Sequence, residues 1–416
     1  MSLIDLLDDK NVWEQYYQYK LSLLKASNFT EELRDYIDDE KYKTVVDAIR
    51  KKETFPLPKK AVISKMSTPK KRTIYSYPNN ENMVFKLMTN LILRRYDKIF
   101  SRGLYSFRPN KNATSAVKYL KSHPDIDNLY SYKVDVSNYF NSISIDKMTP
   151  ILQKTLENDT ELFHFLSALL SESCVMDKGK IIKENKGIMA GTPQACFYAN
   201  LYLMDMDRYF EERNILYIRY SDDIIVFADT REKVKEYAEI IKMFLKERGL
   251  SVNSAKEHFS TPEEGWTFLG FSYCKGKVDI APSSVKKIKA KMRRKSRALK
   301  RWYEREGKCC EQAARAFIRI FNRKLFGSVS NESDDNDLTW SYWYFPVINT
   351  TESLNVIDSY AQDCVRYLMS GKRNKGRFKV HYSDIKTLGL RNLVHEYYAK
   401  NETKVPENAP QVPGRV

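Results

Sequence analysis

The 416-residue sequence lacks the cysteine and histidine patterns of zinc sites and redox motifs. Its six cysteines form no Cys-x-x-Cys pair, and its five histidines stand at no spacing typical of zinc ligands. We therefore expect reduced, mostly buried thiols in a cytosolic protein. No Gly-x-x-x-x-Gly-Lys-Ser/Thr loop occurs either, which excludes a nucleoside-triphosphate motor of that type.

Long apolar runs are also missing, and none approaches the length needed to span a bilayer. The first nine residues are acidic and are not expected to form a signal peptide. Basic residues, in contrast, are abundant: 70 Lys and Arg face 53 Asp and Glu, and the formal net charge is +17. This charge favours a polyanion, either nucleic acid or an anionic membrane surface. Our default expectation is a cytoplasmic, folded, nucleic-acid-binding protein with no membrane association.

Residues 217–227 place a polar Ser-Asp-Asp centre between two runs rich in Tyr, Ile, Val and Phe. This pattern predicts a β-hairpin that carries Asp222 and Asp223 on its turn. Ionised carboxylates beside apolar strands are costly unless something compensates them, and a divalent metal ion is the usual compensation. A solvated acidic turn fits the same pattern, so this stretch alone leaves both interpretations open.

A second candidate carboxylate ends another predicted strand. Residues 129–136 read as a strand buried at its end, where Asp135 stands between Val134 and Val136. The acid could simply cap the helix expected to follow it. Asp135 becomes a candidate metal ligand only if it meets Asp222 in space.

Two further segments could contact a nucleotide. Residues 187–200 contain two glycines and a proline in a tight loop before a helix, which permits close approach of backbone to a ligand. Lys71, Arg72 and Arg108 could bind phosphates, arginine through its bidentate fork. A solvated basic face is the alternative for these three side chains.

Residues 286–324 hold sixteen Lys or Arg against three Glu, a local net charge of +13. Ile288, Met292 and Leu299 keep a helical period, so one face is expected to pack while the other stays basic. Such a helix suits a nucleic-acid backbone, and its binding would weaken with salt. The candidate contacts are Lys286, Lys287, Lys291, Arg293, Arg294 and Arg297.

Taken in order, these segments resemble the motifs of the reverse transcriptase family. Residues 133–140 are similar to its metal-binding strand, 187–200 to its substrate loop and helix, and 220–223 to its Tyr-x-Asp-Asp hairpin. Lys256 is similar to the lysine motif that follows. The primer-grip strand is similar to Phe268, Leu269 and Gly270, and the fingers motifs of bacterial members are similar to Arg72 and residues 105–109.

The resemblance covers roughly residues 60–280 and implies an α+β fold, the right-hand polymerase. We expect an N-terminal helical segment at 1–55, fingers and palm at 56–282, and a basic helical thumb and C-terminal region at 283–416. The family's common glutamine before the second loop glycine is Ala190 here, so its contact is absent or supplied elsewhere. The Ala-Gly-Thr-Pro form of the loop resembles the bacterial antiviral (defence-associated) reverse transcriptases.

The implied activity is RNA-directed DNA synthesis with two Mg²⁺ ions about 3.5–4 Å apart. By the family pattern, Asp135 and Asp222 would bridge both ions, the Val136 carbonyl could complete one coordination sphere, and Asp223 is a third carboxylate. Arg72 and Arg108 would hold the triphosphate, with Lys71 a weaker candidate. The remaining nucleotide-binding candidates are the backbone at Gly191 and Pro193, Lys256 near the leaving pyrophosphate, and Phe140, whose ring would exclude a 2′-hydroxyl.

The implied partners are an RNA template, expected to be a dedicated non-coding RNA in antiphage defence, the DNA product and dNTPs. Three alternatives stay open: a retron-type enzyme, untemplated or protein-primed synthesis, and an inactive RNA-binding scaffold. The presence of all three aspartates speaks against the scaffold. The oligomeric state is left open.

Overall fold

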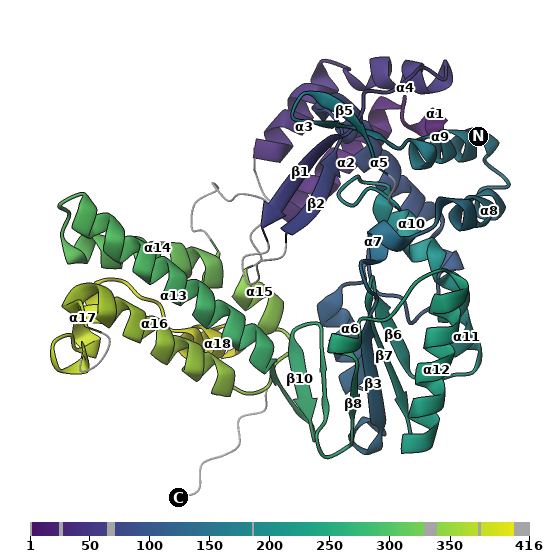
Figure 1. The fold of residues 1–416 in the computed structure, drawn as a ribbon. Coiled ribbons are helices and arrows are strands. Elements are labelled where there is room, and N and C mark those ends of the chain that lie inside the picture. Colours follow the sequence, from purple (N-terminus) through teal and green to yellow (C-terminus); the bar gives the residue numbers. More distant parts are fainter. Residues whose placement is uncertain are drawn as a thin grey trace, which may run out of the picture. The chain divides into compact units, whose positions relative to one another are not determined.

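The computed structural model describes residues 2–24, 28–64, 71–184, 187–327, 339–372 and 376–402. The chain divides into two compact units, Met1–Leu269 and Gly270–Val416 (Figure 1). Within the described ranges, every helix is too short or too polar to cross a membrane. The predicted domain limits at residues 55 and 282 fall inside the two units and stay predictions.

The first unit begins with four helices, as the spacing of apolar residues predicts. Buried side chains recur every three or four residues, for example Leu33, Tyr36 and Ile37 in the third helix. Asp159 anchors the chain start, because its carboxylate accepts the Leu3 backbone N–H at 2.8 Å. The helices are α1 (Leu3–Leu6), α2 (Lys10–Leu24), α3 (Asn28–Asp38) and α4 (Tyr42–Arg50).

A four-stranded sheet follows, in the order β2-β1-β4-β5. Two antiparallel hairpins, β1–β2 and β4–β5, meet through one parallel contact between Lys59 and Met176. The strands are β1 (Lys59–Ser64), β2 (Lys71–Ser76), β4 (Cys174–Asp177) and β5 (Lys180–Lys183).

The second sheet of this unit is antiparallel, in the order β6-β7-β3-β8. Helix α12 (Arg231–Glu247) packs on β7 and β3 (Figure 1). Its apolar stripe ends near Gly249, whose φ of +74° is easily adopted by glycine. The strands are β3 (Tyr130–Asp135), β6 (Tyr217–Tyr220), β7 (Asp223–Ala228) and β8 (His258–Ser260).

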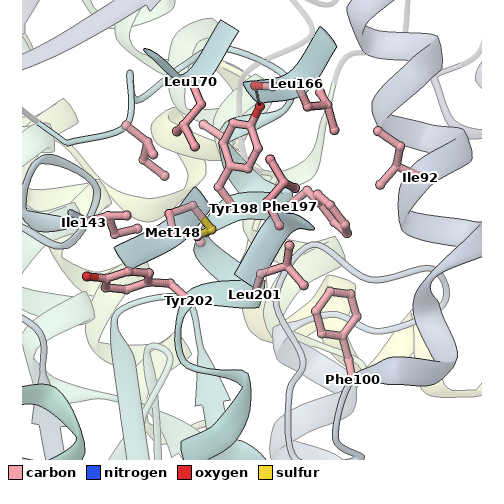
Figure 2. Close-up of a cluster of buried hydrophobic side chains, with 14 of the residues drawn as sticks. Ile92, Phe100, Ile143, Met148, Leu166, Leu170, Phe197, Tyr198, Leu201 and Tyr202 are labelled. Carbon is pink, nitrogen blue, oxygen red and sulfur yellow. Dashed lines mark hydrogen bonds between the residues drawn. The ribbon is translucent and has the colours of Figure 1, made fainter. Parts of the chain in front are cut away.

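Helix α10 (Ala195–Tyr202) lies in the core of the first unit and is buried on every side. Figure 2 shows Phe197, Tyr198, Leu201 and Tyr202 of this helix among apolar side chains from other segments. The Tyr198 hydroxyl donates to the Leu166 carbonyl at 2.8 Å, so its polar atom is satisfied. The loop before α10 and the residues after it are therefore attached to a closely packed helix.

The first unit contains further helices and one more strand. They are α5 (Asn79–Arg95), η1 (Asp97–Ile99), α6 (Ala113–Lys121), η2 (Ile126–Asn128), α7 (Tyr139–Ser142), α8 (Ile145–Thr155), α9 (Thr160–Ser171), α11 (Met204–Glu212), η3 (Ser254–Lys256) and β9 (Trp266–Phe268).

The second unit contains a β-hairpin and a group of helices. Helix α13 (Pro282–Arg305) begins with proline at its first position and buries a stripe that includes Ile288, Met292 and Leu299. It packs against α14 (Cys310–Phe326) and α16 (Glu352–Ser370). The other elements are β10 (Phe271–Cys274), β11 (Lys277–Ile280), α15 (Trp340–Tyr344), η4 (Gly376–Phe378), α17 (Tyr382–Thr387) and α18 (Leu393–Glu402).

The predicted α+β class is confirmed, because helices and largely antiparallel sheets build the first unit. The predicted hairpin at residues 217–227 is confirmed as β6 and β7. Asp223, expected on the turn, is instead the first residue of β7, because it pairs with Tyr220.

Candidate active site

Three aspartates, two from neighbouring strands and one from the turn between β6 and β7, meet at one end of the second sheet. Asp135 ends β3 and lies opposite Asp223, the first residue of β7. Asp222 lies in the turn before β7, where the Val136 N–H donates to its carbonyl at 2.9 Å. Each aspartate offers a carboxylate oxygen, and these oxygens lie within 4.8 Å of one another. The structure thus brings Asp135 and Asp222 together, the condition that the sequence left open.

The turn has its own backbone requirement. Ser221 adopts a φ of +59°, in the left-handed region, which lets the chain reverse between β6 and β7. The reversal leaves Asp222 at the tip and Asp223 in register with Asp135.

Burial and mutual repulsion disfavour the charged carboxylates. Burial raises the pKa of Asp222, and the nearby Asp135 carboxylate raises it further. Burial also raises the pKa of Asp223 to about 6; the Lys133 ammonium opposes this shift, whereas Asp222 and Asp135 add to it. A divalent cation would relieve all of these penalties, and carboxylate oxygens are the ligands that Mg²⁺ prefers. The donor set therefore fits a magnesium site.

Lys256 compensates part of the negative charge, and Asn253 holds the backbone of Asp135. The Lys256 ammonium donates to Asp135 Oδ2 at 2.6 Å, and the Asn253 backbone N–H donates to the Asp135 carbonyl at 2.8 Å. Burial favours neutral Lys256, but the hydrogen bond to Asp135 and the three carboxylates raise its pKa overall. Lys256 therefore stays charged beside the acid cluster, the name used below for Asp135, Asp222 and Asp223.

The glycine loop, residues 187–193, is hydrogen-bonded both to Phe140 and to strand β2. The Ile188 N–H donates to the Phe140 carbonyl at 2.9 Å, and the Ala190 carbonyl accepts the Tyr75 N–H at 2.9 Å. Gly191 has a φ of +106°, and a Cβ there would lie 2.8 Å from the Tyr75 carbonyl oxygen. Only glycine suits this position, for both reasons. The half-buried Phe140 ring packs edge-on against Tyr139.

The basic residues predicted to bind phosphate lie in different environments. Lys71 and Arg72 are exposed on β2, and Arg72 is close enough to lower the pKa of Asp222 against the burial effect. Arg108 is 6% exposed and forms a bidentate pair with Asp97, at 2.7 and 3.0 Å, while also donating to the Ser101 carbonyl. A triphosphate contact by Arg108 would require its guanidinium to leave these partners.

The predicted primer-grip and nucleic-acid contacts follow the acid cluster along the chain. Phe268 is fully buried at the end of β9, and Leu269 and Gly270 adopt positive φ of 48° and 88°. On α13, five of the six predicted contacts are exposed and Lys291 is half-buried. The exposed residues are Lys286, Lys287, Arg293, Arg294 and Arg297.

Sequence reasoning missed a buried ion pair between Arg219 of β6 and Asp207 of α11. A signal was present, because Arg219 stands among tyrosine and isoleucine in a predicted buried strand. An arginine in such a strand needs an acidic partner.

This arrangement of acids, glycine loop and hairpin agrees with a comparison against known families. The family described as reverse transcriptase (RNA-dependent DNA polymerase) matches residues 49–273, more than half of the chain. The chain belongs to the reverse transcriptase family. The α+β fold is therefore that of right-hand polymerases, as the order of motifs predicts.

Among curated proteins, the chain is similar to the retron Ec86 reverse transcriptase of Escherichia coli. The two are 23% identical over 228 residues, which cover 53% of this chain and 64% of that relative. The chain thus spans less than two thirds of the relative's length.

Solved structures similar to the chain include two telomerases. The telomerase of Candida albicans, solved with the TWJ fragment of telomeric RNA, has a TM-score of 0.45 and 12% identity, covering 88% of this chain and 69% of that chain. The apo telomerase of Candida tropicalis has a TM-score of 0.46 and 12% identity, covering 83% and 65% respectively.

Proposed function

We propose that the chain is an RNA-directed DNA polymerase that uses two Mg²⁺ ions. The observation that carries this proposal is the acid cluster, in which three carboxylates lie within 4.8 Å in a chain of the reverse transcriptase family. Bound ions would supply charge neutralisation at the attacking 3′-oxygen and the leaving phosphate. The residues that would hold them are Asp135, Asp222, Asp223 and the Val136 carbonyl.

The chain's own residues would bind and orient the nucleotide. Arg72, exposed on β2 and near Asp222, would hold the triphosphate together with Lys71. Lys256 carries a positive charge in direct contact with Asp135, and it could stabilise or protonate the leaving pyrophosphate. Phe140, fixed through its carbonyl to the glycine loop, would lie below the sugar and select deoxynucleotides.

The exposed basic face of α13 would contact the backbone of the RNA template and DNA product. Its apolar stripe is buried in the second unit, so the five exposed basic side chains, Lys286, Lys287, Arg293, Arg294 and Arg297, are available to a polyanion. Contacts of this kind do not depend on base sequence and weaken with salt.

The biological setting we propose is antiphage defence, in which the chain copies a dedicated non-coding RNA in the bacterial cytoplasm. This part rests on the resemblance of the Ala-Gly-Thr-Pro loop. The similarity to the retron Ec86 reverse transcriptase favours a retron-type enzyme as the second candidate.

The deciding experiment is sequencing of nucleic acid that co-purifies with the wild type and with Asp222→Asn/Asp223→Asn, with and without dNTPs. Templated synthesis predicts cDNA complementary to one RNA in the wild type alone. The matched control is Asp229→Asn, because Asp229 follows the other end of β7 and is exposed beside Lys233. The control should keep full activity.

The alternatives predict different products. A branched RNA–DNA molecule would identify the retron-type enzyme, and nucleotides attached to a tyrosine, found by mass spectrometry, would identify protein priming. The same RNA in both proteins with no DNA would identify the scaffold. Phage plaque counts on cells carrying the wild type or the double variant test the role in defence.

A further inference from the structure

A fully buried ion pair contacts the turn between β6 and β7, Ser221–Asp222, which is called the catalytic turn below. The Arg219 guanidinium, in the middle of β6, donates from Nε to Asp207 Oδ1 at 2.8 Å and from Nη2 to Asp207 Oδ2 at 2.5 Å. The two side chains are 0% and 1% exposed. The Tyr217 hydroxyl donates to the same carboxylate at 2.9 Å. The pair therefore holds β6 against α11 in one orientation.

The rest of the guanidinium binds backbone carbonyls. Nη2 donates to the Asn200 carbonyl at 3.0 Å, and Nη1 lies 3.4 Å from the carbonyls of Ala199 and Ser221. The first two belong to the last turn of α10, whose carbonyls have no partner inside the helix. The third belongs to the peptide that joins Ser221 to Asp222. One side chain thus connects the end of α10 to the turn that carries a metal-binding candidate.

Neighbouring hydrogen bonds extend this network to segments that hold predicted nucleotide-binding residues. The Tyr139 hydroxyl donates to the Ala199 carbonyl at 2.6 Å, and Tyr139 precedes Phe140. The Asn200 amide donates to the Ser106 carbonyl at 2.9 Å and accepts from the Ser106 hydroxyl at 3.0 Å. Residues 105–109, which resemble a fingers motif, are therefore hydrogen-bonded to the same end of helix α10.

A buried ion pair is a poor stabiliser by itself, because the desolvation of two charges offsets their attraction, and apolar residues often replace such pairs without loss. Its contribution is a fixed orientation, because the two parallel hydrogen bonds of a bidentate pair hold both side chains in one geometry. The Ser221 φ of +59° makes this relevant, because a non-glycine residue in that conformation needs support from its surroundings.

We propose that the Arg219–Asp207 pair is a positioning device for the catalytic turn. Through the Ser221 carbonyl it holds the Asp222 carboxylate near Asp135, where the two would bind a metal ion together. Arg219 touches neither substrate nor ion, so it acts through Asp222. The inference rests on the proposed function only in calling the turn catalytic.

The test is Mn²⁺ binding to the purified full chain, followed by electron paramagnetic resonance, together with kcat and KM for dNTPs. Arg219→Lys keeps the charge but loses the fork. We expect its Mn²⁺ affinity and its kcat to fall about 10-fold or more, as for other residues that orient metal ligands. The KM for dNTPs should change less than about threefold, because the variant alters positioning and leaves nucleotide contacts intact.

Asp205→Asn is the matched control, since Asp205 also lies on α11 but pairs with Arg248 at the surface, at 2.5 Å. It should bind Mn²⁺ as the wild type does. Thermal unfolding identifies folded variants. If Arg219→Lys does not fold, Tyr217→Phe replaces it, because it leaves the ion pair and removes one hydrogen bond to Asp207. It should lower Mn²⁺ affinity in the same direction by a smaller factor.

Wild-type Mn²⁺ affinity and kcat in a folded Arg219→Lys protein would overturn the inference, and so would an equal loss in Asp205→Asn. If the wild type makes no cDNA, the proposed function fails. The Mn²⁺ titration still decides whether Arg219 positions the turn, so the two failures are distinguishable.

Discussion

The raised pKa of Asp223 predicts that the metal-free acid cluster destabilises the folded chain. Its pKa rises from 3.8 to about 6, mainly because of burial. Replacement by the isosteric amide removes the charge and keeps the shape. Asp223→Asn should therefore be more stable than the wild type in EDTA at neutral pH.

The magnitude follows from proton linkage, at about 1.4 kcal/mol per pK unit. Folded Asp223 holds its proton up to about pH 6, whereas the unfolded residue loses it near pH 4. The wild-type free energy of unfolding therefore falls as pH rises through this window, and the loss is complete above it. The amide of the variant does not titrate, so the variant's advantage should be about 1.5 kcal/mol at pH 5 and about 3 kcal/mol at pH 8.

Urea unfolding at both pH values, with EDTA and then with Mg²⁺, measures this difference. Saturating Mg²⁺ should stabilise the wild type and narrow the gap, since a ligand that binds only the folded state adds stability. Asp229→Asn, which alters an exposed carboxylate at the far end of β7, is expected to show no gain at pH 8. An Asp223→Asn protein with no larger advantage at pH 8 than at pH 5 would contradict this account of the acid cluster.

Three further predictions concern the nucleotide and nucleic-acid contacts. Phe140→Ala should admit ribonucleotides and raise their kcat/KM relative to dNTPs by about 10-fold or more, because a steric block is lost. Unchanged sugar selectivity would remove the assignment of Phe140. The control is Phe163→Ala, which alters a half-buried phenylalanine on a helix. Gly191→Ala should lower the free energy of unfolding by about 2–4 kcal/mol in urea titrations, because of its φ and the Tyr75 carbonyl; Gly179→Ala has a positive φ but no close atom, so it should lose less. Replacing Arg293, Arg294 and Arg297 with glutamine should weaken RNA binding and flatten its salt dependence by about two logarithmic units per decade; an unchanged slope in fluorescence titrations would exclude the α13 face.

Much of the site could be predicted because its signals are local. The two apolar runs on either side of Ser221 and Asp222 predict a hairpin from the local sequence alone, and strands β6 and β7 confirm it. The apolar stripe of α13 likewise follows from the helical period. The order of the motifs along the chain was enough to predict the family, which the match over residues 49–273 confirms.

Other features depend on contacts between residues far apart in the chain. The sequence suggested Asp135 as a helix cap or a metal ligand, and only the pairing of β3 with β7 places it opposite Asp223. For Arg108 the sequence suggests a phosphate contact, which stays a prediction, and only the folded chain shows that its guanidinium pairs with Asp97. The partner of Arg219 could not be identified, because any of several acids could have compensated it.

The secondary structure around the site, the placement of Asp135 at a strand end and of Asp222 on a hairpin turn, and the excess of positive charge on α13 all follow from the order of residues alone. Which charges meet, and how deeply they are buried, depends on the folded chain. Local conformation is set by a residue's own backbone and near neighbours, whereas pKa shifts and ion pairs depend on desolvation and on partners that only folding brings together. The raised pKa of Asp223 and the Arg219–Asp207 pair belong to this second group.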